Sequence, residues 1–145
     1  MGMDVYGIKP QDETGKYFRN NISAWGPLWD TVCDITGNVL SKKQTKMGHH
    51  NVGIKITKKQ SVLMSNILHN HLFGHDVDNI VINIDSFQKF YNKYQKNILN
   101  YPVVKKSMNI EGSELYESIK NIEDFIANII GFILFTKSSG GFKID

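Results

Sequence analysis

The residues best suited to bind a ligand lie in one aromatic stretch near the start of the sequence. Arg19 is the single arginine among the 17 Lys and Arg residues, and it stands close to Tyr17 and Trp25. A guanidinium offers a planar fork of donors that grips phosphate or carboxylate and stacks on rings, which an ammonium group does poorly. Together with Tyr6, this group predicts a site for a small anionic, nucleotide-like ligand. The alternative is structural: Arg19 ties loop carbonyls over a core, and the tryptophans pack inside that core.

A second polar group lies in residues 48–53. Gly48 and Gly53 flank the run His49, His50 and Asn51, with one valine after it. Two glycines in so short a segment favour a tight bend that exposes polar side chains. Imidazole and amide groups both donate and accept hydrogen bonds at neutral pH. We therefore expect His49, His50 and Asn51 to contact the same ligand as Arg19.

The sequence carries no clear pattern for a metal site or a nucleophile. His71 and His75 are four residues apart, but a glycine lies between them and the metalloprotease pattern is absent. Cys33 falls on an apolar helical stripe, which is typical of a buried small side chain. We expect no metal, no cofactor and no catalytic residue, and hence binding without turnover. A nucleotide hydrolase that uses His49 or His50 as its general base remains an alternative.

Composition indicates a globular protein of the cytoplasm. The single cysteine excludes an internal disulfide, and residues 1–10 lack the pattern of a signal peptide. The longest apolar run, residues 125–135, is far shorter than the roughly 20 residues that span a bilayer. We therefore expect no membrane contact.

The mild net charge of +3 hides one strongly basic stretch. Residues 35–59 contain no acid but six lysines, namely Lys42, Lys43, Lys46, Lys55, Lys58 and Lys59. Such a stretch attracts polyanions, but surfaces that bind nucleic acid usually add arginine, and this one has none. A solvated lysine-rich face is therefore the favoured interpretation, and nucleic acid is the least favoured partner.

Apolar periodicity predicts a single α+β domain over residues 1–145, mostly helical with a small sheet. Strands are expected at residues 3–6, 80–84 and 142–144, with a shorter extended piece at Tyr17-Phe18. A sharp turn at residues 138–141 would return the last strand to the sheet.

Capping signals predict where the helices begin and end. The first expected helix begins at Pro27 and ends at a Gly37 cap, and the second begins at a capping box formed by Thr57 and Gln60. The third spans residues 87–98. The fourth begins at Ser113, and the fifth spans residues 122–135 after a cap at Asn121. Residues 38–56 are expected to form a connection. The apolar helical faces of residues 87–94 and 125–135 could supply the interface of a homo-oligomer.

Several motifs resemble those of a family of small bacterial and bacteriophage proteins with no assigned activity. The motifs are Asp4-Val5-Tyr6-Gly7, the run Gly15-Lys16-Tyr17-Phe18-Arg19-Asn20-Asn21, Trp25 with Pro27-Leu28-Trp29, Gly48-His49-His50-Asn51-Val52-Gly53, and Ser139-Gly140-Gly141-Phe142-Lys143-Ile144. The family's usual Asp in the bend is Val52 here, and the paired Cys-x-x-Cys motifs of many members are missing. The resemblance implies a phage or prophage source, in the cytoplasm of a bacterial host, rather than a reaction.

These observations lead to one functional hypothesis and two alternatives. The hypothesis is a phage-type binding protein, with a possible anti-defence role, that sequesters a small anionic ligand through Tyr6, Tyr17, Arg19, Trp25 and residues 49–51. The first alternative is an inhibitor that binds a host protein through an aromatic helical face or the lysine stretch. The second is the His-dependent hydrolase.

Overall fold

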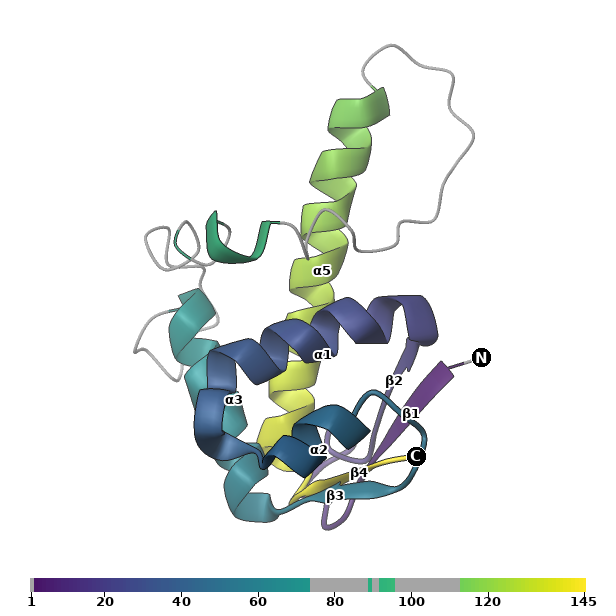
Figure 1. The fold of residues 1–145 in the computed structure, drawn as a ribbon, viewed down its shortest axis with the longest axis vertical. Helices are drawn as coiled ribbons and strands as arrows, with labels where there is room; N and C mark the ends of the chain where they lie inside the picture. Colours follow the sequence, from purple (N-terminus) through teal and green to yellow (C-terminus); the bar gives the residue numbers. More distant parts are fainter. Residues whose placement is uncertain (1, 74–88, 90–91, 96–112) are drawn as a thin grey trace.

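The computed structural model describes residues 2–73, 89, 92–95 and 113–145, which form one α+β arrangement (Figure 1). The strands are β1 (Gly2–Gly7), β2 (Tyr17–Asn21), β3 (Ile54–Ile56) and β4 (Phe142–Ile144). The helices are α1 (Ile22–Thr36), α2 (Lys42–Met47), α3 (Lys58–Phe73) and α5 (Ser113–Ser138), with a 3-10 turn at Gly37–Val39. The predicted α+β class, mostly helical with a small sheet, is confirmed.

The four strands form one sheet in the order β2-β1-β4-β3, and all neighbours are antiparallel. The first and last strands are therefore the two central ones. Side chains alternate across β1, where Met3 and Val5 are buried while Asp4 and Tyr6 point to the opposite, outer face. The predicted strands at both ends of the sequence are confirmed. The predicted strand at residues 80–84 lies outside the described residues.

Helices α1, α3 and α5 supply most of the core beneath the inner face of the sheet. Trp25 and Trp29 of α1 stack on each other with ring centroids 5.3 Å apart, and Phe132 of α5 meets both rings edge-on. Phe132 also contacts Phe142 of β4, which joins the helical layer to the sheet. Burying such large aromatic side chains is the main source of stability in a domain of this size.

Helix α1 begins five residues earlier than predicted. The side-chain oxygen of Asn21 accepts a hydrogen bond of 2.8 Å from the backbone N–H of Ala24, so Asn21 is the N-cap. Pro27 consequently lies inside the helix, where it removes one backbone hydrogen bond rather than starting the helix. The predicted helix end at Gly37 is confirmed, with its N–H bonded to the carbonyl of Cys33, but the cap is not left-handed, because φ is 59° while ψ is −116°.

The lysine-rich segment 38–56 is not the plain connection that the sequence predicted. It contains α2, which opens with a capping box between Ser41 and Gln44, and it ends in β3. The Gln44 amide also donates to the carbonyl of Lys55 at 3.0 Å and to the side chain of Gln60 at 2.9 Å. Gln44 thus ties α2 to the open edge of β3 and to the start of α3.

Helix α3 begins as predicted and packs closely on α5. Thr57 and Gln60 form the expected capping box. The hydroxyl groups of Ser61 and Ser65 donate to the α5 carbonyls of Thr136 and Ile133, at 2.6 and 2.9 Å. Small side chains at these two positions allow the close approach of the helices.

The two predicted helices near the end of the chain are one helix, α5, which runs past α1 and α3 toward the sheet (Figure 1). The expected break at Asn121 does not occur, because Asn in a helix interior costs only about 0.5 kcal/mol relative to Ala. The predicted turn that follows is confirmed, with positive φ at Gly140 and Gly141. Phe125, Ile129 and Phe132 are buried within the chain, so most of the apolar surface of residues 125–135 is core rather than an oligomer interface.

Of the predicted helix at residues 87–98, the structure describes residues 89 and 92–95, which are helical. The rest of that stripe lies outside the described residues, so its use as an interface stays a prediction.

Replacing Gly48 by Ala should destabilise the protein by about 2 kcal/mol or more, because the added Cβ would lie 2.3 Å from the buried Trp29 ring. Gly26→Ala is the matched control. A Cβ at Gly26 meets nothing within 4 Å, and in a helix the change should stabilise by about 0.5–1 kcal/mol. Urea unfolding followed by tryptophan fluorescence measures both. Equal stability of the two variants would contradict this packing.

Candidate ligand-binding face of the sheet

Four side chains form a line across the outer face of the sheet. The register pairs Lys55 of β3 with Lys143 of β4, Lys143 with Tyr6 of β1, and Tyr6 with Tyr17 of β2. Residues paired across antiparallel strands project to the same face of a sheet. These four side chains therefore lie side by side, in this order, from one edge of the sheet to the other. We call Lys55, Lys143, Tyr6 and Tyr17 the outer row. It places two cations beside two aromatic rings.

The two tyrosines of the outer row pack against each other and remain open to solvent. Their ring centroids are 5.2 Å apart with an interplanar angle of 42°, and each residue is 45% exposed. Because each residue is nearly half exposed, part of the pair is open for a flat ligand to stack on. The structure thus brings together Tyr6 and Tyr17, as predicted.

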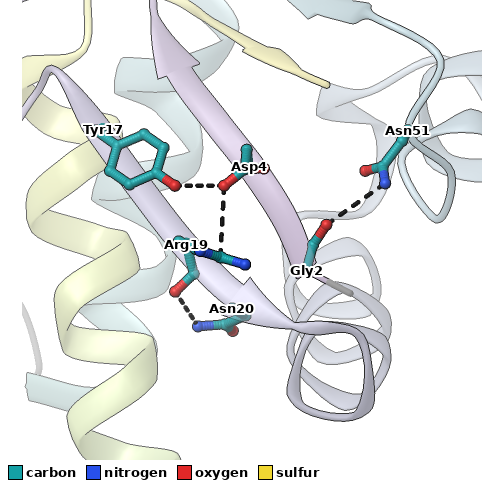
Figure 2. A network of polar contacts seen from close by, with 6 residues as sticks. All are labelled: Gly2, Asp4, Tyr17, Arg19, Asn20 and Asn51. Carbon is teal, nitrogen blue, oxygen red and sulfur yellow. Dashed lines mark hydrogen bonds and ion pairs between the residues drawn. The ribbon is translucent and has the colours of Figure 1, made fainter.

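Asp4 organises the polar groups next to these rings. Its carboxylate accepts a hydrogen bond from the hydroxyl of Tyr17 and forms an ion pair with Nε of Arg19 at 3.5 Å (Figure 2). Arg19 lies opposite Asp4 in the strand register, and its side chain is 59% exposed. Among the described residues, Asp4 is the one acid within ion-pair distance of Arg19, and it engages Nε. The two terminal nitrogens of Arg19 thus remain available to an anion.

Asn51 also reaches this face. Its amide nitrogen lies 3.4 Å from the carbonyl of Gly2, at the start of β1 (Figure 2). The side chain of Arg19 lies against Gly2 as well, since a Cβ built there would be 2.7 Å from Nε. Asn51 and Arg19 therefore both lie near Gly2, and their joint contact with a ligand stays a prediction.

Trp25 does not belong to the exposed group, which corrects the prediction that its ring contacts a ligand. The residue is 1% exposed, and its indole N–H donates to the carbonyl of Gly48 at 2.8 Å. Trp29 donates in the same way to the carbonyl of Thr45 at 2.9 Å. Both rings fill the core while their polar ends hold α2 and the bend that follows it.

The two adjacent histidines lie elsewhere too. His49 points to α1, where its Nε2 lies 2.9 Å from a carboxylate oxygen of Asp30. It lines a groove beside α2 rather than the outer row. His50 is exposed in the turn, and its backbone N–H bonds to the carbonyl of Met47. The predicted ligand set is therefore divided between the sheet face, the core and the groove.

Three residues of the face escaped the sequence analysis: Asp4, Lys55 and Lys143. The alternation of Phe142, Lys143 and Ile144 indicated that Lys143 points away from the core, but not which strand lies beside it. Only the pairing of β4 with β1 places this lysine next to Tyr6.

Cys33 is a poor nucleophile, as its place on the apolar stripe suggested. Burial is the main reason that the pKa of its thiol is raised to about 12; a hydrogen bond with Thr45 acts in the opposite direction, and the nearby Asp30 carboxylate adds to the rise. Within residues 2–73, 89, 92–95 and 113–145, no group of three or more His, Cys, Asp or Glu side chains is arranged to hold a metal ion.

No protein family model matches this sequence, and no curated protein or solved structure is similar to it. The family resemblance therefore stays a prediction. None of the helices in the described part of the chain combines the length and apolar character needed to cross a membrane.

The hydrogen bond to Asp4 raises the pKa of the Tyr17 phenol above its ordinary value of 10.0, because a nearby carboxylate disfavours the phenolate. Since the folded phenol keeps its proton to higher pH than the unfolded one, the stabilisation is complete below pH 10 and is lost as pH rises through the raised pKa. Asp4→Asn should therefore lower the pKa of Tyr17. Tyrosinate absorbance during a pH titration measures this pKa, and the Tyr17→Phe variant identifies which part of the signal comes from Tyr17.

The matched control is Asp145→Asn. It removes the same charge from the neighbouring strand, where Asp145 pairs with Lys143 at 3.6 Å. An equal fall in the pKa of Tyr17 in both variants would mean that the overall charge of the face, rather than the hydrogen bond to Asp4, sets its titration.

Proposed function

We propose that this protein binds a small anionic ligand that carries an aromatic ring, such as a nucleotide, on the outer face of its sheet. The observation that carries the proposal is the register that aligns Lys55, Lys143, Tyr6 and Tyr17 beside Arg19. The role we infer is sequestration without turnover, as a phage-type protein acting against a defence pathway in the cytoplasm of a bacterial host.

The rings supply the contact with the flat part of the ligand. Stacking a base on an exposed aromatic side chain contributes about 1–3 kcal/mol and tolerates different bases. Tyr6 and Tyr17 present one continuous aromatic surface, because their rings already contact each other. Such a surface loses little conformational freedom when a ligand binds, which favours affinity.

The cations supply the contact with the anionic part. Lys55, Lys143 and Arg19 contribute three positive charges, against which stand the carboxylates of Asp4 and Asp145. The side chains of this face therefore carry a net positive charge of one. That balance favours an anion of low charge over a cation.

The composition of the face supports binding rather than a reaction. Among the described residues of the outer row and its neighbours Asp4, Arg19 and Asn51, there is no imidazole and no thiol. Imidazole is the most common general acid or base, and thiol is the nucleophile that needs least activation at neutral pH. A retained ligand should therefore be recovered chemically intact, which native mass spectrometry of the purified protein can test.

Arg19→Lys should weaken binding of a nucleoside phosphate at least tenfold, equivalent to about 1.4 kcal/mol, because an ammonium group cannot form the two-pronged contact. Isothermal titration with a panel of nucleoside mono- and triphosphates measures the change. Tyr6→Leu should weaken binding by a similar factor through the loss of stacking.

Lys93→Arg is the matched control, because it exchanges the same two residue types beside Asp34 of α1, away from the sheet. It should leave affinity unchanged. Unchanged affinity in Arg19→Lys, with the ligand still bound, would refute the assignment of Arg19 to the site.

A protein partner is a second candidate for the same face. Ile8, which follows β1, is 50% exposed and adds apolar area at the end of that strand. Tyrosine and arginine are enriched in the residues that dominate protein–protein binding energy. A stoichiometric partner captured from host lysate, lost in Tyr17→Ala, together with no retained small molecule, would favour an inhibitor of a host protein over sequestration.

A further inference from the structure

A groove beside α2 is separate from the outer row in its residues and its contacts. It has a volume of about 370 Å³ and runs between α2 and the segment that follows α1. It is lined by Gly37, Asn38, Leu40, Lys42, Thr45, Lys46 and His49. None of these residues belongs to the outer row, so the groove needs its own explanation.

One wall of the groove presents hydrogen-bond donors at helical spacing. Lys42, Thr45, Lys46 and His49 recur at intervals of three and four residues, which places them on one face of α2 and the turn that follows it. Lys42 and Lys46 supply two ammonium groups to this wall, and Asn38 adds an amide to the opposite wall, while Nε2 of His49 is engaged with Asp30. A ligand that fits this lining must be rich in acceptors.

The donor wall is fixed in place from behind. Trp29 donates its indole N–H to the carbonyl of Thr45 at 2.9 Å, and Trp25 donates to the carbonyl of Gly48 at 2.8 Å. The contact with Asp30 at 2.9 Å sets the orientation of the His49 ring. A wall held in this way needs little rearrangement on binding, and that lowers the free-energy cost of association.

The charge of the groove favours an anion. Lys42 and Lys46 have no acidic side chain within ion-pair distance in the described part of the chain, and residues 35–59 contain no acid at all. The carboxylate of Asp30 and the carbonyl end of α1 add negative charge that partly offsets these two lysines. Asp30 is already engaged with His49, so the balance of the lining stays positive.

We propose that this groove binds the phosphate group of a small molecule, independently of the outer row. A phosphate presents three or more strong acceptor oxygens, which matches several donors on one wall better than the two oxygens of a carboxylate do. Lysine binds phosphate as a point charge and needs no fork geometry, so the absence of arginine here is no obstacle. The volume leaves room for an organic group attached to the phosphate.

The test uses the full chain and three probes at constant ionic strength: inorganic phosphate, pyrophosphate and ribose 5-phosphate. Amide chemical-shift changes on titration should concentrate at residues 37–49. The Lys42→Gln/Lys46→Gln double variant should weaken binding at least tenfold. Tighter binding of ribose 5-phosphate than of inorganic phosphate would assign a phosphorylated organic ligand, and the reverse order would assign the free anion.

Lys43→Gln is the matched control, because it removes one charge from the same helix at a position that does not line the groove. Its affinity, measured from the shifts of residues 37–49, should stay within about twofold of the wild type. Should the double variant fail to fold, as judged by its thermal unfolding midpoint, the single Lys46→Gln variant carries the test with a smaller expected loss.

Three results would overturn the proposal. The first is the absence of binding by any probe. The second is an equal loss in Lys43→Gln, which would indicate diffuse attraction to the lysine stretch. The third is a set of shift changes confined to the sheet face, with none at residues 37–49, which would place the anion on that face.

Discussion

Two hydrogen bonds from the buried tryptophans hold together the parts of this protein that could bind a ligand. The indole N–H groups of Trp25 and Trp29 are paired with the carbonyls of Gly48 and Thr45. A buried N–H without a partner costs about 1–3 kcal/mol, so the core is satisfied only when the segment carrying α2 is docked. A six-residue helix is unstable alone, and α2 therefore depends on this docking as much as the core does.

The same docking explains why residues that are close in the sequence lie in different parts of the structure. The bend after α2 passes over the indoles, with His49 directed to α1 and Asn51 directed to the start of β1. Gly48 lies between the rings and the bend, where any side chain would collide with Trp29. The chain thus separates an anion-binding groove from an aromatic sheet face within three residues.

Local signals in the sequence predicted much of this fold, and non-local ones did not. The capping box of Thr57 and Gln60 and the helix end at Gly37 are short-range patterns with a physical cause, and both are confirmed. The predicted start of α1 was wrong because Pro27 is a strong signal for a first helical residue, whereas the N-cap is Asn21. A tryptophan such as Trp25 can pack in a core or contact a ligand. Only the fold, in which its indole N–H donates to the carbonyl of Gly48, shows that Trp25 belongs to the core. The neighbours of Tyr6 depend on strand pairing, which periodicity does not encode.

The central position of β1 and β4 has a consequence for how the protein forms during synthesis. Val5 pairs with Ile144, about 140 positions later, so β1 leaves the ribosome long before its second neighbour exists. Until then the nascent chain exposes an unpaired strand edge beside Tyr6, which is the kind of surface that aggregates or recruits chaperones. Lys143 joins the outer row with that last strand, so the capacity to bind a ligand on the sheet should arise only after translation has passed residue 144.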